Sequence, residues 1–247
     1  MDKNHLLINL EAVSFAYPGG RSVLKDLHFK LHLKEKVGLI GPNGSGKTTL
    51  FHVIMGLIKP TSGRIELFGR EMKEEKDFRF ARQRIGLLFQ DADDQLFSPT
   101  VLEDVAFGPL NLGKPVSEAR DIAAETLNAL GLEGFEDRVT YKLSGGEKKL
   151  VSLATVLAMK PEVLLLDEPT TGLDLETTTM IINVLKKIDL SYIFISHNMD
   201  FISQTTDQIH GMSHGRILLE ERKVPHTHDH SHGYGHLPHT HAEEEHG

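Results

Sequence analysis

The 247-residue chain contains no cysteine and no tryptophan, and its longest apolar runs have only the length of a strand. The lack of cysteine excludes a secreted scaffold held by disulfides and fits a reducing compartment. A bilayer-spanning helix needs ~18 or more apolar residues, so an integral membrane protein is excluded as well. The first five residues lack the pattern of a signal peptide, and the net charge of −8 argues against a nucleic-acid surface. We therefore expect neither a leader peptide nor a nucleic-acid partner.

Histidine is abundant and unevenly distributed. Eight of the 15 histidines fall in residues 226–247, a segment with four acidic residues and no lysine or arginine. Residues 1–225 carry a balanced charge of −4. This change in composition predicts a folded domain over residues 1–223 and a disordered histidine-rich tail over residues 224–247.

Apolar periodicity predicts alternating strands and helices. Short apolar runs typical of strands recur at residues 6–15, 22–33, 37–40, 64–68, 85–89, 163–166, 192–195 and 216–219. Helical patterns cover residues 47–55, 118–130 and 146–159, and Ser117 is the expected N-cap of the second. Strands on both sides of a helical region at about 95–160 predict an α/β core with a helical subdomain.

Residues 41–48 read Gly-Pro-Asn-Gly-Ser-Gly-Lys-Thr and match the phosphate-loop pattern G-x-x-x-x-G-K-[ST]. Glycines allow backbone N–H groups to face phosphate oxygens, and the following helix N-terminus adds partial positive charge. A glycine-rich turn is the alternative, but the flanking strand and helix favour nucleotide binding. We expect Lys47 to pair with the outer phosphates and Thr48 to ligate Mg²⁺. The expected nucleotide-binding residues here are Gly41, Asn43, Gly44, Gly46, Lys47, Thr48 and Thr49.

Two carboxylates follow the apolar run at residues 163–166. Asp167 suits a Mg²⁺ site, and Glu168 is placed to orient or deprotonate an attacking water. Without the phosphate loop, a strand followed by a turn would explain the same residues equally well.

Residues 143–147 read Leu-Ser-Gly-Gly-Glu at the start of a predicted helix. Ser144 and Glu147 fit the S-x-x-E pattern of a capping box. The two glycines between them also favour a second anion site at the helix N-terminus. A single nucleotide cannot obviously use two such sites in one chain, whereas two subunits facing each other can.

Together these motifs resemble those of the ATP-binding-cassette ATPases, and the resemblance covers about residues 6–222. The ordered set comprises residues 41–48, Gln90, residues 143–147, Asp167-Glu168, residues 171–174 and Ser196-His197. The resemblance implies the ABC ATPase fold, which is a phosphate-loop NTPase core with an antiparallel β subdomain and a helical subdomain. It also implies ATP and Mg²⁺ as ligands, integral membrane transport subunits, a second ATPase subunit as in a homodimer, and a peripheral place on the cytoplasmic face of the membrane.

The resemblance also assigns roles to single residues. Tyr17 matches the aromatic residue that stacks on adenine, and Asp174 the aspartate that crosses the dimer interface. Glu168, His197 and Gln90 are then the expected catalytic residues, with His197 at the γ-phosphate. The implied Mg²⁺ ligands are Thr48, Gln90 and Asp167, and the residues for the partner's ATP are Ser144, Gly145 and Gly146. The chain departs from the family at Glu147, where many members have glutamine.

One cassette without a long insertion fits the separate ATPase subunit of a transporter. Residues 89–97 and 100–109 are similar to the energy-coupling-factor importers, which take up cobalt, nickel or vitamins. Residues 91–94 otherwise form an ordinary acidic loop, and residues 101–112 a core helix that ends at Gly108-Pro109.

The tail favours a metal as the cargo. Its alternating histidines offer neutral imidazoles, which suit Ni²⁺, Co²⁺ or Zn²⁺ better than Cu(I). The expected ligands are His226, His228, His230, His232, His239 and His241. A purification tag or a passive tail would explain them without a function. An ATP-driven importer of nickel or cobalt is the main hypothesis. A vitamin importer, a metal exporter and a soluble ATP-regulated metal-storage protein remain the alternatives.

Overall fold

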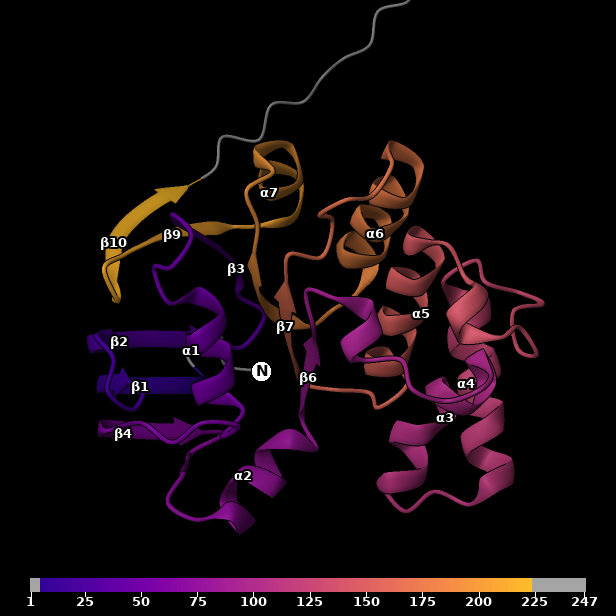
Figure 1. Ribbon diagram of the computed structural model, residues 1–247, viewed down its shortest axis with the longest axis horizontal. Coiled ribbons are helices and arrows are strands. Elements are labelled where there is room, and N and C mark those ends of the chain that lie inside the picture. The colour runs from indigo at the N-terminus through magenta and orange to yellow at the C-terminus, as the bar shows by residue number, and fades with distance from the viewer. Residues whose placement is uncertain (1–4, 224–247) are drawn as a thin grey trace, which may run out of the picture.

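The computed structural model describes residues 5–223, with side chains up to residue 218. The predicted tail, with its six proposed histidine ligands, lies outside the described residues. Two sheets and a group of helices make up the described chain, and the second sheet lies between the first sheet and the helices (Figure 1). Among residues 5–223, no helix has the length and apolar character needed to cross a membrane.

The first sheet is antiparallel and has the strand order β2-β1-β4-β5. Its strands are β1 (Leu6–Ala16), β2 (Ser22–His32), β4 (Ser62–Leu67) and β5 (Arg70–Glu71). Buried and exposed positions alternate along the second half of β2, so Leu27, Phe29 and Leu31 enter the core while His28 and Lys30 face outward.

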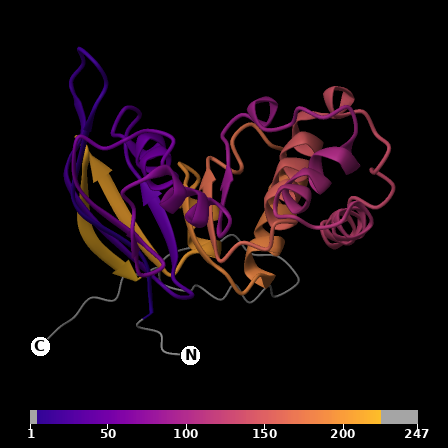
Figure 2. The same ribbon diagram turned by 90° about the horizontal axis from the view of Figure 1, so that it is seen from below.

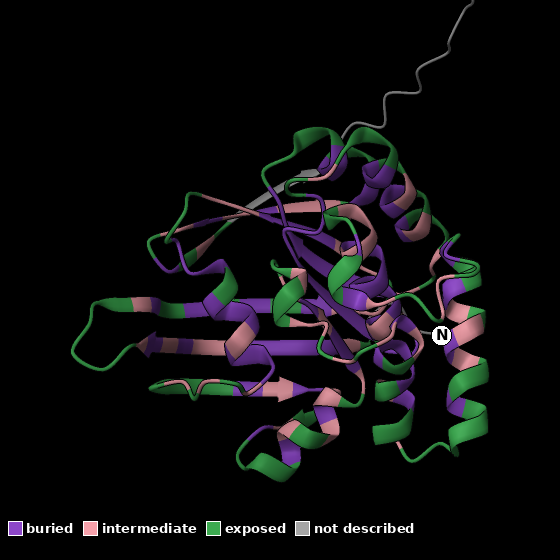
Figure 3. Ribbon diagram, turned by 45° about the vertical axis from the view of Figure 1, so that its right-hand side comes forward, coloured by how far each residue is buried: buried purple, intermediate pink, exposed green. Residues whose placement is uncertain are grey.

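The second sheet has the order β10-β9-β3-β8-β7-β6 and is parallel except for β10. Its strands are β3 (Lys36–Ile40), β6 (Ile85–Leu88), β7 (Val163–Asp167), β8 (Ser191–Ile195), β9 (Gln208–Ser213) and β10 (Arg216–Lys223). All residues of β7 and β8 are buried, as expected for parallel strands covered on both faces (Figure 3). Parallel pairing brings the carboxyl ends of β3, β6, β7 and β8 to one edge, where ligands bind in open α/β sheets.

The helices fall into two groups. Those packed around the sheets are α1 (Lys47–Ile54), α2 (Glu75–Arg82), α6 (Leu175–Lys187) and α7 (Met199–Thr205). The helical group comprises η1 (Ala92–Asp94), α3 (Val101–Asn111), α4 (Val116–Ala129), η2 (Thr140–Lys142) and α5 (Gly145–Leu157). Helices α3, α4 and α5 pack on one another through buried residues such as Val105, Ala123 and Val151. This group lies at the end of the molecule away from the antiparallel sheet (Figure 2).

The structure corrects the expected N-cap of α4 and the helix end that the alternative interpretation placed at Gly108-Pro109. Helix α4 begins at Val116 with Pro115 as its N-cap, so Ser117 as N-cap is wrong. The Pro115 carbonyl already accepts the Ala119 N–H at 2.9 Å, and this bond places Ser117 inside the first turn. Helix α3 does not end at Gly108-Pro109 but continues through Pro109 to Asn111.

Candidate functional site: a phosphate pocket at the sheet edge

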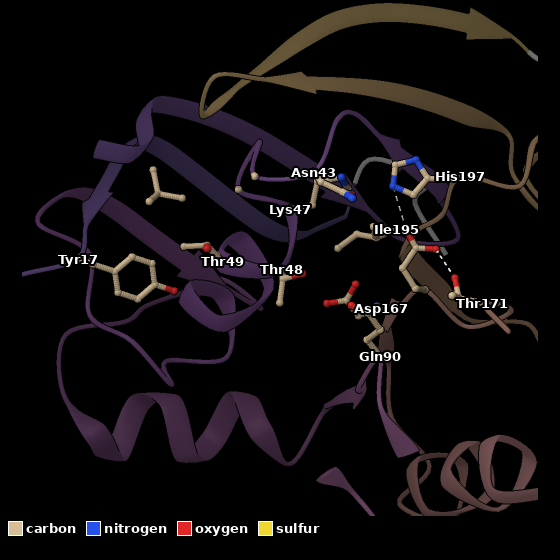
Figure 4. A pocket seen from close by; sticks show the side chains of 14 residues that line it. Tyr17, Asn43, Lys47, Thr48, Thr49, Gln90, Asp167, Thr171, Ile195 and His197 are labelled. Atoms are coloured by element: carbon tan, nitrogen blue, oxygen red, sulfur yellow. Dashed lines mark hydrogen bonds and ion pairs between the residues drawn. The ribbon is translucent and has the colours of Figure 1, made fainter. Parts of the chain in front are cut away.

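The loops that follow β3, β6, β7 and β8 meet at a pocket of about 570 Å³ (Figure 4). Eleven of the predicted site residues line it: Tyr17, Asn43, Gly44, Gly46, Lys47, Thr48, Thr49, Gln90, Asp167, Glu168 and His197. Val23, Thr171 and Ile195 line it as well. The lining residues from Asn43 to His197 meet because the strands before them are parallel neighbours in one sheet, whereas Tyr17 and Val23 come from the antiparallel sheet.

The phosphate loop has a conformation that requires glycine. Gly41 and Gly46 have positive φ values of 156° and 106°. A Cβ at Gly41 would lie 2.1 Å from the Met212 carbonyl oxygen, and one at Gly46 would lie 3.0 Å from that of Val23. Helix α1 then begins at Lys47 without a side-chain N-cap, which leaves its first N–H groups to a bound anion.

Lys47 is a buried cation above this loop. Only 7% of the residue is exposed, and its Nζ donates to the carbonyl oxygens of Gly41 at 2.7 Å and Pro42 at 3.1 Å. Burial lowers the pKa of Lys47, and the carboxylates of Glu168 and Asp167 oppose this shift. The lysine therefore supplies positive charge next to the acidic side of the pocket.

The oxygen atoms on the acidic side of the pocket are suitable ligands for Mg²⁺. Asp167 is 4% exposed, and its Oδ1 has no hydrogen-bond partner among the described residues. Burial raises the pKa of Asp167, whereas a hydrogen bond from Thr48 and the positive charge of Lys149 act in the opposite direction. A carboxylate, the Thr48 hydroxyl and the Gln90 amide oxygen are hard ligands of the kind that Mg²⁺ prefers. Residues 5–218 contain no group of three or more His, Cys, Asp or Glu that could hold a metal ion.

Glu168 is fixed at the end of β7 by its backbone and its carboxylate. Its φ of +46° is uncommon outside glycine, and such residues cluster at functional sites. One carboxylate oxygen accepts the Thr171 hydroxyl at 2.8 Å, and the other lies 3.3 Å from His197 Nε2 (Figure 4). The arrangement presents a buried carboxylate and a partly exposed imidazole to the same side of the pocket.

The predicted residues Ser144, Gly145, Gly146 and Asp174 lie outside this pocket. They are instead close to one another, because the N-termini of α5 and α6 adjoin. A Cβ on Gly146 would lie 2.9 Å from Thr177 Oγ1, and the Asp174 carboxylate accepts the Thr177 N–H at 2.7 Å. Each chain therefore has a phosphate pocket and a separate glycine-containing surface.

Glu147 faces its own helix. Its Oε2 accepts the Ser144 N–H at 2.8 Å and the Ser144 hydroxyl accepts the Glu147 N–H at 3.3 Å, which together form a capping box. Its Oε1 accepts Arg138 Nη1 at 2.9 Å. The hydrogen bond from the Ser144 backbone holds the pKa of Glu147 below its ordinary value. The unusual carboxylate is thus used in capping and in an ion pair.

We expect Glu147→Gln to have little effect, because glutamine also completes a capping box. The rate of ATP hydrolysis should change by less than about twofold, and the free energy of unfolding should fall by less than about 1 kcal/mol. Steady-state hydrolysis and urea denaturation measure the two quantities. A tenfold change in hydrolysis would instead place this side chain against the nucleotide.

Sequence patterns did not identify Lys149 as a candidate, and they included Gln95 only as part of residues 89–97. Lys149 is buried in α5, and its Nζ donates to the carbonyl oxygens of Phe89 at 3.0 Å and Gln90 at 2.7 Å. Burial lowers the pKa of Lys149, and the negative charges of Asp167, Asp91 and Glu168 oppose this shift. One signal was available: residues 149, 153 and 156 share a face of the helix, so a lysine stands in line with buried apolar residues.

Comparison with known proteins agrees with this geometry. Residues 24–171 match the family described as ABC transporter. The chain is 44% identical to the energy-coupling factor transporter ATP-binding protein EcfA of Methanothermobacter thermautotrophicus, over 87% of this chain and 70% of that protein. It is 43% identical to the cobalt import ATP-binding protein CbiO of Rhodobacter capsulatus, over 87% and 78%. The structure of CbiO1 from Clostridium perfringens, part of the ABC transporter complex CbiONQ, superposes with a TM-score of 0.78 at 35% identity and covers 88% of this chain and 89% of CbiO1.

The chain belongs to the ABC transporter family and has its ATPase fold, as predicted. Proteins of this class bind ATP with Mg²⁺ and couple its hydrolysis to transport. Its likeness to EcfA and CbiO further identifies it as an ABC ATPase of the energy-coupling-factor type, which confirms the resemblance drawn from the motifs.

Proposed function

We propose that this chain is the ATPase subunit of an energy-coupling-factor importer for a transition metal ion, nickel or cobalt. Two copies would enclose two ATP molecules and drive integral membrane subunits. The observation that carries the proposal is the pocket that joins Lys47, Asp167 and Glu168 while Ser144–Gly146 lies outside it.

Each side chain has a specific task in this proposal. Lys47 and the loop N–H groups bind the phosphates, and the exposed face of Tyr17, which packs edge-on against Phe15, stacks on adenine. Mg²⁺, held by Thr48, Gln90 and Asp167, would neutralise phosphate charge. Glu168 accepts the proton of the attacking water or orients that water, and the neighbouring His197 contacts the γ-phosphate.

The partner copy would complete the site. Ser144, Gly145 and Gly146 begin α5 and offer backbone N–H groups at a helix N-terminus, outside their own chain's pocket. Asp174 precedes Leu175, an apolar residue that is 83% exposed. A second copy placed over this surface would bury Leu175 and bring Ser144–Gly146 to the phosphates bound by its partner.

An exposed aromatic pair suits the membrane subunits. Phe97 and Phe107 are 66% and 46% exposed, and their rings pack edge-on with centroids 4.8 Å apart. Phe97 follows Gln90 by seven residues, so a partner docked on this pair would contact the segment that continues from the pocket-lining Gln90. Docking of a membrane partner at this surface would place the chain on the cytoplasmic face of the membrane.

Cobalt import by the relative CbiO supports a transition metal as the cargo. The histidine-rich composition of residues 224–247 supports the same choice and adds nickel. Competitive uptake of Co²⁺, Ni²⁺ and Zn²⁺ tests the proposal in cells that express this chain with its membrane subunits. ATP-dependent uptake of Co²⁺ or Ni²⁺ supports it, whereas uptake of a vitamin alone, or metal efflux, contradicts it.

Removal of residues 224–247 should abolish the binding of Ni²⁺, Co²⁺ and Zn²⁺ to the purified chain, because those residues hold the clustered imidazoles. The hydrolysis rate should stay within about twofold of the full chain, since the ATP pocket is built from residues 17–197. Calorimetric titration measures the binding, and a full-length chain with the six tail histidines replaced by serine controls for length. Equal metal binding by all three proteins would contradict this role of the tail.

A further inference from the structure

Lys149 is a buried lysine outside the ATP pocket. The residue is 3% exposed, and a lysine so deeply buried requires hydrogen-bonded partners. Its partners are two backbone carbonyl oxygens of the glutamine loop, which we define as residues 89–95. The ammonium donates to Phe89 at 3.0 Å and to Gln90 at 2.7 Å.

These two carbonyls belong to the peptide groups on either side of the Gln90 Cα. A residue has only two soft backbone dihedrals, and each peptide group moves as a plane. Binding both planes to one ammonium therefore fixes φ and ψ of Gln90, and with them the direction of its Cβ. Charge-assisted hydrogen bonds are strong enough to hold this conformation.

Gln95 binds the same loop to the same helix from its other end. Its Oε1 accepts the Phe89 N–H at 3.1 Å, and its Nε2 donates to the Ser152 carbonyl and the Thr155 hydroxyl, both at 2.8 Å. The glutamine loop is thus fixed to α5, the helix that begins with the Ser144–Gly146 segment.

The side chain of Gln90 lines the ATP pocket together with Asp167, whereas Lys149 does not. We infer that Lys149 is a positioning residue that holds the Gln90 amide at the Mg²⁺ and water position and makes it follow α5 when the helical group moves. The inference rests on the proposed role of Gln90 at that position. A purely structural lysine would stabilise the fold without acting through Gln90.

A double-mutant cycle on ATP hydrolysis by the full-length chain separates these roles. Lys149→Met should lower kcat on the order of tenfold. The KM for ATP should stay within about twofold, since Lys149 lies outside the pocket. In a chain that already carries Gln90→Ala, the same substitution should lower kcat by less than about twofold.

Lys148→Met is the matched control. Lys148 neighbours Lys149 and pairs with Asp93 of the same loop at 2.6 Å, but the bond is to a surface carboxylate rather than to the Gln90 backbone. Its kcat should remain within about twofold of wild type. Lys149→Arg, which keeps a cation with several hydrogen-bond donors, should retain most of the activity. If Lys149→Met does not fold, Lys149→Gln replaces it in the double-mutant cycle.

Two results would overturn the inference, and they differ. An equal loss of kcat with and without Gln90 would show that Lys149 acts independently of Gln90, while the role of Gln90 would stand. A wild-type kcat in Gln90→Ala alone would remove the proposed role of Gln90 and, with it, the inference.

Discussion

Replacement of Glu168 by glutamine should stop turnover while leaving ATP bound. The amide keeps the size of the side chain and can still contact Thr171, but it cannot accept a proton from water. General base catalysis contributes about 10²–10⁴-fold, so kcat should fall by that factor or more. ATP affinity should be nearly unchanged, because the phosphate loop and Lys47 are untouched. Two ATP-bound copies should then accumulate as a closed dimer.

Single-turnover hydrolysis and size-exclusion chromatography with Mg-ATP measure both effects. Glu162→Gln is the matched control, since Glu162 precedes the same strand at its opposite end and pairs with Arg84 at 3.0 Å. That variant should hydrolyse ATP like wild type and remain monomeric after turnover. Unchanged turnover in Glu168→Gln would refute the role of Glu168 as general base.

Local sequence patterns were sufficient to predict the buried strands of the second sheet and the phosphate loop. The runs that became β3, β7 and β8 are short, apolar and followed by polar residues, which is the pattern of buried parallel strands. The phosphate loop was equally visible, because its glycines are needed by the backbone itself. The loops that form the pocket could therefore be predicted from the sequence, but the relative positions of their side chains could not.

The elements that the sequence did not predict are stabilised by contacts between residues far apart in the chain. Helix α6 contains three consecutive threonines, Thr177–Thr179, and two isoleucines, all of low helix propensity, yet burial of Ile181 and Leu185 and the Asp174 cap stabilise it. The sequence also left the direction of Glu147 open, since Arg138 comes within reach of one carboxylate oxygen, while the Ser144 N–H binds the other, only in the folded chain. Lys149 was missed for the same reason, because its partners lie in a loop about 60 residues away.

Replacement of Lys47 by alanine should abolish ATP-driven function at an earlier step than Glu168→Gln, namely nucleotide binding. The ammonium lies between the Gly41 and Pro42 carbonyls at the phosphate loop and balances the charges of Asp167 and Glu168. Without it, the phosphates of ATP would meet two carboxylates with less positive charge to compensate them. We expect ATP affinity to fall by about 10–100-fold and hydrolysis to become undetectable at ATP concentrations that saturate wild type.

Lys47→Arg should not restore function, because Lys47 lines the pocket and must reach the phosphates itself, and a planar guanidinium would place its charge differently from a compact ammonium. Lys59→Ala, which removes an exposed lysine beyond the end of α1, is the control and should bind ATP like wild type. Fluorescent-nucleotide titration gives the affinities, and metal uptake by cells carrying each variant gives the transport outcome. Wild-type affinity in Lys47→Ala would mean that the loop binds phosphate through its backbone alone. Equal metal uptake by Lys47→Ala and wild-type cells would separate ATP hydrolysis from import and overturn the proposed transport function.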